Sequence, residues 1–343
     1  MKKTLIALAV AGTFAAPAFA ATSNVDVYGK LHMAVSVFDD QAAANNDVQI
    51  SSNASRFGLK GSEDLGGGLS GIWQIESSLN LDEQNGMLAA RNSFVGLSSK
   101  SLGTVLLGNH DTPLKLVGRA VDLFGDTLGD TRNVLGGGSD TRAKNVAVYV
   151  SPSFSGLSFA AAYSTDLVTT PVVALPTNNT GDLEDRAVYN LNATYKNGPL
   201  FAGLGYGDGD GHEALDLGAH WRAAAAYTLG NLKFVGQYDK LNGDLSTDPD
   251  FDAWMLGAAY TMGNVVLKAN YMDGDKDGTS ADPKQWTIGA DYNLSKRTTA
   301  YALYANGENL GAMGSRFSSS DAITSGVAGG DISAFSVGVT HSF

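Results

Sequence analysis

Apolar and polar residues alternate along most of this chain, and this period of two limits what the chain can fold into. At the C-terminus, Phe335, Val337 and Val339 alternate with small or polar residues, and the alternation continues through His341 to Phe343. Segments 186–196, 285–293 and 25–36 repeat the pattern. A period of two indicates a β-strand with two different faces, and almost no segment shows the period of 3.6 that a helix requires. The chain is therefore predicted to be all-β.

The strands and their connections have the dimensions of a membrane barrel. The alternating segments run for about ten residues, the length of a tilted membrane-spanning strand. Connections alternate between short ones, such as 196–198 and 228–231, and long ones rich in Gly, Asp, Asn and Ser. Short turns at one end and long loops at the other are typical of outer-membrane barrels. The spacing predicts about sixteen antiparallel strands in one closed sheet, a count that depends on two less regular segments, 102–108 and 154–163.

A soluble periplasmic all-β protein, such as a sandwich, is the alternative, because its strands also alternate. Three features favour the barrel over a sandwich. The chain, at 343 residues, is too long for one ordinary sandwich, its loop lengths alternate, and Trp and Tyr recur near strand ends as in an aromatic girdle. No run of about 18 apolar residues follows residue 20, so a membrane role has to come from strands.

The first twenty residues have the pattern of a secretory signal peptide. Lys2 and Lys3 precede an apolar run, and Ala18-Phe19-Ala20 matches a small-residue cleavage site. We predict cleavage between Ala20 and Ala21, which divides the chain into a signal peptide, 1–20, and a barrel domain, 21–343. The formal net charge of -12 argues against nucleic-acid partners, and the lack of cysteine rules out a disulfide framework.

The connection 110–141 is long, yet it is rich in apolar residues. A loop that extends into solvent does not need such residues, whereas a loop packed against an inner wall does. Within it, Asp122, Asp126 and Asp130 recur every four residues, a spacing that predicts three carboxylates on one side of a helical turn. The alternative is a solvated acidic surface loop.

Basic residues on the early strands are predicted to face the lumen. Arg56 and Lys60 alternate with the apolar Phe57 and Leu59, and Lys30 lies in the same way opposite its apolar neighbours. Arg91 does not fit this alternation. Parity groups it with Ser93, Val95 and Leu97, so either those residues line the lumen or a bulge intervenes.

Several motifs, in the same order along the chain, resemble the general porins of Gram-negative bacteria. They are VDVYGK (25–30), SRFGLKGSEDLGGGL (55–69), RNSFVGL (91–97), LGTVLLG (102–108), VDLFGDTLGD (121–130), KNVAVYVSPSFSGLSFAAAYS (144–164) and GVTHSF (338–343). The resemblance implies a sixteen-stranded, homotrimeric diffusion channel whose long third loop folds into the lumen. It also implies a basic wall cluster of Arg56, Arg91 and Arg142, and an assembly signal that ends in Phe343. Asn109 stands where many relatives have an arginine, so the resemblance does not fix the ion preference.

The expected function is passive diffusion of ions and small hydrophilic solutes across the outer membrane, which the chain reaches through the periplasm. Such a channel needs no catalytic residues, no cofactor and no metal, and its partners are its own copies, membrane lipid and lipopolysaccharide. A row of arginines facing a row of aspartates would make a strong transverse field at the narrowest point. The alternatives are an outer-membrane enzyme, which requires a catalytic constellation on the wall, and an adhesin, for which the loops show no specific signal.

Overall fold

The structure is a computed structural model that describes residues 24–40, 47–82, 87–136, 140–166, 186–211, 218–243, 250–278, 282–310, 312–313, 323–324 and 330–343. The predicted signal peptide and its cleavage site at Ala20 and Ala21 lie outside these residues. Within them, no helix is long and apolar enough to cross a membrane.

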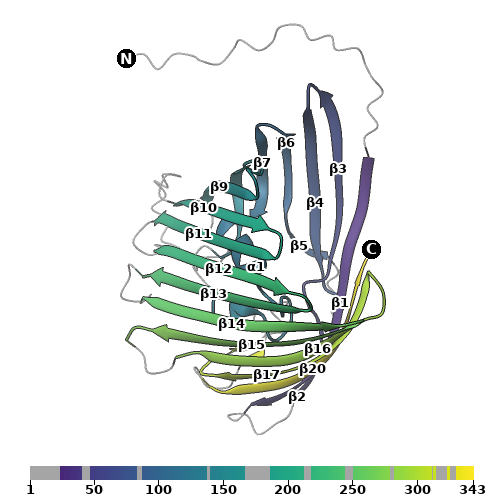
Figure 1. The fold of residues 1–343 in the computed structure, drawn as a ribbon, viewed down its shortest axis with the longest axis vertical. Helices are drawn as coiled ribbons and strands as arrows, with labels where there is room; N and C mark the ends of the chain where they lie inside the picture. Colours follow the sequence, from purple (N-terminus) through teal and green to yellow (C-terminus); the bar gives the residue numbers. More distant parts are fainter. Residues whose placement is uncertain are drawn as a thin grey trace, which may run out of the picture.

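Eighteen strands form one antiparallel sheet that closes on itself (Figure 1). Closure is made by the first and last strands of the sheet, β1 and β20, which pair from Lys30↔Ser342 to Asp40↔Ile332. The strands are β1 (Asn24–Asp40), β2 (Asp47–Ser52), β3 (Arg56–Gly66), β4 (Leu69–Leu79), β5 (Met87–Ala90), β6 (Ser93–Ser99), β7 (Gly103–Asp111), β8 (Arg142–Val150), β9 (Leu157–Asp166), β10 (Arg186–Asn197), β11 (Leu200–Gly211), β12 (Ala219–Leu229), β13 (Leu232–Asn242), β14 (Phe251–Met262), β15 (Val265–Lys276), β16 (Lys284–Asn293), β17 (Thr298–Glu308) and β20 (Ile332–Ser342). A separate two-stranded piece, β18 (Ala312–Met313) with β19 (Ile323–Thr324), lies in the last long connection.

These eighteen strands make a barrel of sixteen, as predicted. β2 and β3 pair with successive halves of the same strand, β1, so together they form one interrupted strand of the wall. β5 and β6 pair in the same way with β4. Counting each interrupted pair once gives the closed 16-stranded antiparallel barrel. The two less regular segments contribute β7 and β9.

Short turns join the strands at one end of the barrel. The hairpins β12–β13 and β14–β15 close through two residues each, Gly230-Asn231 and Gly263-Asn264. Both glycines have a φ of +58°, in the left-handed region that two-residue hairpin turns require. The residue types at these turns therefore fix the hairpin registers, and with them the side chains that face inward.

The packed core of the molecule lies inside the barrel, between the wall and the connection that follows β7 (Figure 1). This connection, 112–141, is called the inserted loop below. Its Val117, Val121 and Leu135 pack against inward-facing residues of β12, β13 and β14, and are wholly buried. Phe124 and Leu128 pack in a second cluster against β17 and β20. The predicted insertion of the third loop is confirmed, since a solvated surface loop would leave these side chains exposed.

Candidate functional site

The inserted loop begins with a short helix, α1 (Pro113–Arg119). Thr112 caps it by accepting a hydrogen bond from the Lys115 backbone N–H, and Pro113 occupies the first turn, where no N–H is needed. The Leu114 N–H donates to Asn190 Oδ1 of β10 at 2.6 Å, which seats the helix on the inner wall. The helix therefore lies before the three aspartates, and the turn predicted to run through them is not helical.

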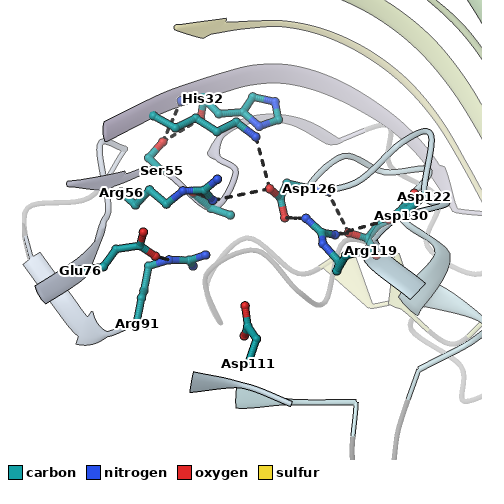
Figure 2. A network of polar contacts seen from close by, with 12 residues as sticks. His32, Ser55, Arg56, Glu76, Arg91, Asp111, Arg119, Asp122, Asp126 and Asp130 are labelled. Carbon is teal, nitrogen blue, oxygen red and sulfur yellow. Dashed lines mark hydrogen bonds and ion pairs between the residues drawn. The ribbon is translucent and has the colours of Figure 1, made fainter. Parts of the chain in front are cut away.

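Asp126 is the loop carboxylate that meets the wall (Figure 2). Its oxygens lie 3.3 Å from Lys30 Nζ and 3.9 Å from Arg56 Nη1 on the wall. Two arginines of the loop itself also reach it, Arg119 at 2.9 Å and Arg132 at 3.5 Å. Burial alone would raise the pKa of the Asp126 carboxyl, but these four cations outweigh burial and hold that pKa well below its ordinary value.

Asp122 and Asp130 are turned away from the wall and into the loop. Asp130 accepts from Arg132 at 2.6 Å and from Arg119 at 3.1 Å, and both aspartates have side chains that are 1% exposed. The oxygens of Asp122 accept from the Phe124 N–H at 2.9 Å and from Arg119 at 3.4 Å. Burial, together with the charge of Asp130, raises the pKa of Asp122 to about 7. Bonds to Arg132 and Arg119 outweigh burial at Asp130 and lower its pKa.

The three predicted aspartates thus do not form one row facing the wall. Only Asp126 pairs with cations of the wall, whereas Asp130 pairs with Arg119 and Arg132 and Asp122 pairs with Arg119, all within the loop. The acidic spacing alone did not predict the role of these two loop arginines. Their positions carried the signal, since Arg119 precedes Asp122 by three residues and Arg132 follows Asp130 by two.

On the facing wall, the basic side chains are paired with carboxylates of neighbouring strands. Arg91 Nε lies 2.6 Å from Glu76 Oε1, and Figure 2 shows the two side chains next to each other. Asp111 Oδ1 lies 3.1 Å from Arg142 Nη2 and 3.0 Å from Nζ of Lys115, which comes from α1. The predicted wall residues Arg56, Arg91 and Arg142 therefore gather on one side of the lumen, each with a carboxylate within reach.

Breaks in the wall strands explain how these side chains face inward. Arg91 lies in the gap between β5 and β6, which resets the alternation, so Val95 and Leu97 remain exposed on the outer surface. The gap between β2 and β3 contains Ala54 at a φ of +54°, and its carbonyl accepts from Arg56 Nη1. Such interruptions re-aim side chains and are common beside functional sites. Of the two readings of Arg91, the intervening break is correct.

The two predicted lysines lie in different places. Lys30 reaches the inserted loop through Asp126. Lys60 instead lies over the ring of Tyr28, with its ammonium 5.2 Å from the ring centroid. Its neighbours across the sheet are Asp26 and Gln74, close to the short turn that joins β3 and β4. The structure thus brings Lys30 to the loop and leaves Lys60 nearer the barrel end.

A cavity of about 390 Å³ lies between the inserted loop and this wall. Its charged lining comprises the basic Arg56, Arg91, Lys115, Arg119, Arg132 and Arg142 and the acidic Glu76, Asp111 and Asp126. A second cavity of about 390 Å³ shares Arg56, Arg119 and Asp126 with the first, and extends to Lys268 and Asp291 on β15 and β16. The ion pairs of Asp126 therefore lie where the two cavities meet. Among the described residues, no three potential metal ligands are grouped.

Comparison with known proteins agrees with this architecture. The family model for the Gram-negative porin matches residues 7–312. Outer membrane porin protein 32 of Delftia acidovorans is 31% identical over 366 residues, which cover 100% of both chains. The major outer membrane protein P.IB of Neisseria gonorrhoeae is 28% identical over 88% of this chain and 92% of its own. The solved anion-selective porin from Comamonas acidovorans superposes with a TM-score of 0.77 at 28% identity, covering 94% of this chain and 100% of that one.

The closed barrel, the loop packed inside it and these matches lead to one identification. An aqueous path lined by charged side chains, with an apolar surface turned to the membrane, is the arrangement of a diffusion channel. The chain belongs to the Gram-negative porin family and forms an outer-membrane channel for passive diffusion.

Proposed function

We propose that the inserted loop and the facing wall form the constriction of this channel, and that the constriction favours anions. The observation that carries the proposal is the lining of the cavity between them, in which six basic side chains outnumber three carboxylates. A narrow passage with low-dielectric walls concentrates the field of such charges and raises the local concentration of the opposite ion. Rings of Arg and Lys select anions in this way.

The carboxylates in the cavity are all compensated at short range. Glu76 lies 2.6 Å from its nearest cation, Asp126 2.9 Å and Asp111 3.0 Å. The net charge of the cavity lining is therefore positive. A passing ion meets guanidinium groups that are already held in fixed orientations by their carboxylate partners. Pairing also keeps these arginines extended into the lumen, since a bidentate or shared carboxylate fixes a planar guanidinium better than water does.

The similarity to an anion-selective porin supports this ion preference. The sequence as a whole points the other way, with 35 acidic residues against 23 basic ones. The two tendencies act at different places. Screening limits the reach of charges at the barrel ends to about 10 Å at 0.1 M salt, whereas charges inside the narrow passage act at contact distance. We therefore propose that the cavity, not the net charge, sets the selectivity.

The substrates we propose are ions and small hydrophilic solutes, moved by diffusion with no catalysis and no cofactor. An outer-membrane hydrolase is the competing class. Planar-bilayer recording separates the two: a channel gives stepwise conductance without hydrolysis of ester or peptide substrates, whereas a closed barrel with hydrolytic activity would overturn the proposal.

The experiment for the constriction replaces a charge inside the cavity and one outside it. Arg142→Gln should move the zero-current potential in a KCl gradient toward cations, because one cavity cation is lost. Lys196→Gln, an exposed residue at the end of β10, removes the same charge away from the cavity and should leave the potential unchanged. Equal shifts for the two variants, or none for Arg142→Gln, would contradict the assignment.

We also propose that the channel is a trimer whose subunits meet through β1 to β7 and β20. The support is an asymmetry of the outer surface. Aromatic pairs with tilted rings flank the long loops on β9–β12 and β14–β17, namely Tyr163–Tyr189, Tyr206–Trp221, Trp254–Tyr271 and Trp286–Tyr304. Tyrosines near the short turns complete a second belt on this side: Tyr149, Tyr195, Tyr227, Tyr260 and Tyr292. Such belts mark the levels of the lipid headgroups, so this side faces lipid and lipopolysaccharide.

The other side of the barrel is mainly aliphatic, and among the described residues its strongly exposed aromatic side chains are Phe335 and Phe343 at the β20 edge. Its exposed residues include Val27, Ile75, Val95 and Leu107, and its one outward tryptophan, Trp73, lies flat over Gly61. A surface without belts of Tyr and Trp is suited to contact with another protein subunit rather than with lipid headgroups. Because the chain has no cysteine, single cysteines at Val95 and at Leu204 of β11 can be labelled with a lipid-soluble maleimide in membranes. Protection of Val95→Cys alone supports the interface, and equal labelling of both contradicts it.

We propose that Phe343 acts in assembly by completing the seam of the barrel. Its backbone exchanges two hydrogen bonds of 3.1 Å with Gly29 of β1, and its ring lies over that glycine.

Cleavage between Ala20 and Ala21 stays a prediction. N-terminal sequencing of the protein from outer membranes tests it, with Ala21 expected as the first residue.

A further inference from the structure

Arg222 is a buried cation that lines neither of the two cavities described above, yet it touches the inserted loop at three points. It lies on β12 with its side chain 1% exposed. Its Nη1 donates to the Leu114 carbonyl at 3.4 Å, and its Nη2 donates to the Leu135 carbonyl at 3.1 Å. Nη2 also lies 2.8 Å from Asp140 Oδ2. These contacts join the first helical turn of the loop, its last third and its end.

The guanidinium is held from the wall side as well. Asp239 on β13 accepts from Nε at 2.8 Å and from Nη2 at 2.5 Å. Asp239 in turn is oriented by Gln237 Nε2 at 2.9 Å and His220 Nε2 at 3.2 Å. A single arginine is thus shared between a wall carboxylate and a loop carboxylate, both buried. The planar fork of the guanidinium makes this double role possible, since it offers five donors in fixed directions.

The helix α1 sits directly on this arginine. A Cβ at Gly118 would lie 2.7 Å from Arg222 Nη1, so the close approach depends on a residue without a side chain. The next residue, Arg119, ends the helix and carries the contacts to Asp126 and Asp130. A displacement of α1 therefore displaces the charged groups at the junction of the two cavities. Figure 1 shows α1 inside the barrel, and its contacts fall on β9 to β12.

Other wall side chains each hold one short stretch of the loop. Asn192 donates to the Pro113 carbonyl at 2.8 Å, Asn270 to the Gly129 carbonyl at 3.2 Å and Gln285 to the Leu128 carbonyl at 3.0 Å. Gln285 also accepts from Asn133 Nδ2 at 3.0 Å. Each of these contacts fixes one stretch of the loop. The contacts of Arg222 differ because they tie the beginning of the loop to its end. Loss of Arg222 should leave the loop inside the barrel but allow its ends to separate.

We propose that Arg222 is a positioning residue that sets the width and charge geometry of the constriction from outside the ion path, by tying both ends of the inserted loop to β12. The proposal rests on the constriction proposed above. Arg222 lies on the side of the wall opposite Arg56, Arg91 and Arg142. It would affect selectivity without contacting the permeating ion.

Two neutral substitutions separate this role from simple support of the wall. Asp140→Asn weakens the link between Arg222 and the loop end while keeping the Arg222–Asp239 pair. Asp239→Asn weakens the wall pair while keeping the loop link. If Arg222 positions the loop, Asp140→Asn should raise the single-channel conductance, increase the open-channel noise and reduce the ion selectivity, and Asp239→Asn should change these less. If Arg222 only supports the wall, the order of the two variants reverses.

Arg222→Met and Arg222→Lys complete the series. The methionine variant should show the largest rise in conductance, and the lysine variant an intermediate one, because one ammonium cannot bond both loop ends and Asp239 together. Gel electrophoresis without heating reports folding. A band that migrates differently from the heat-unfolded chain indicates a folded barrel, and loss of that difference indicates that the variant has not folded. Should Arg222→Met not fold, the two asparagine variants decide the matter alone.

A parallel recording of Arg56→Gln distinguishes failure of this inference from failure of the constriction itself. If Arg56→Gln shifts the zero-current potential while folded Asp140→Asn leaves conductance, noise and potential unchanged, Arg222 has no positioning role. If neither variant shifts the potential, the constriction assignment fails first, and the inference that rests on it fails with it.

Discussion

The carboxylate of Asp126 lies 3.3 Å from the ammonium of Lys30, and this contact joins the inserted loop to the first strand of the barrel across the lumen. Lys30 belongs to the strand that closes the barrel against β20, and Asp126 lies in the middle of the loop. The contact crosses the lumen at the level where the two cavities meet. Substitutions at and beside this contact therefore test how the passage selects ions.

Asp126→Asn should make the channel more anion-selective. The substitution removes a carboxylate that four cations share, and leaves their charges to act on passing ions. Asparagine tolerates the φ of +62° at this position, so the loop backbone is expected to persist. Loss of the charge-assisted bonds should lower the free energy of unfolding by about 1.5–3 kcal/mol. Zero-current potentials in a KCl gradient and urea unfolding measure the two effects.

Asp64→Asn serves as its control. Asp64 is an exposed residue near the short turn between β3 and β4, where it accepts from the Gly66 N–H. This variant removes the same charge without touching the loop. An unchanged potential in Asp126→Asn, or an equal shift in the control, would show that the loop carboxylate does not act on the ion.

Arg56→Gln should reduce the preference for anions. Arg56 lines both cavities, and its contact to Asp126 at 3.9 Å is long, so most of its charge is available to a passing anion. Lys60→Gln is the matched control, because Lys60 belongs to the same strand but lies over Tyr28. Comparable shifts in zero-current potential from the two variants would place the selective region at the barrel end instead.

The selectivity should also depend on pH near neutrality through Asp122. Burial and the charge of Asp130 raise the pKa of Asp122 to about 7, so this carboxyl is protonated in acid and becomes charged as the pH rises through that value. The channel should accordingly favour anions more at pH 6 than at pH 8. In Asp122→Asn the part of the pH dependence that comes from this group should vanish. If the variant keeps the whole dependence, Asp122 is not its source.

The same group gives a stability prediction of defined sign. Its pKa in the folded state lies above the ordinary value of 3.8, so between about pH 4 and pH 7 the folded state binds more protons than the unfolded state. The free energy of unfolding should therefore fall as the pH rises through this window. Asp122→Asn should flatten that slope in urea titrations, and a slope identical to that of the parent would refute the assignment.

Gly29→Ala should impair closure of the barrel. An added Cβ would lie 2.4 Å from the ring of Phe343 and 2.7 Å from the Arg56 carbonyl. Overpacking of this kind costs about 1–3 kcal/mol. Gly236→Ala on the outer face of β13 is the control, since its Cβ would meet Leu256 at an ordinary 3.4 Å. The fraction of folded barrel after refolding in detergent should drop for Gly29→Ala alone.

The fold could be predicted because it depends on local information. Alternation of side chains, turn residues such as Gly230 and Gly263 and the pattern of loop lengths are all written in short stretches of sequence. The apolar residues of the inserted loop, Phe124 among them, likewise indicated burial. Each of these signals acts over a few residues, so long-range pairing did not have to be known.

The site could be predicted only in part, because charged partners are chosen by tertiary geometry. Arg56 and Lys30 were placed correctly by parity, but Arg91 required a break in its strand that no local pattern specifies. The capture of Asp122 and Asp130 by Arg119 and Arg132 depends on how the loop folds back on itself. Arg222 gave no signal at all, since its partners lie between 17 and 108 residues away along the chain.

The zero-current potential of the unmodified channel, in a KCl gradient across a planar bilayer, tests most directly whether the constriction favours anions. The basic surplus in the cavity between loop and wall predicts a potential close to the equilibrium potential of chloride, at low and at moderate salt alike. A potential close to that of potassium would mean that the negative net charge of the chain governs permeation, and would contradict anion selectivity at the constriction.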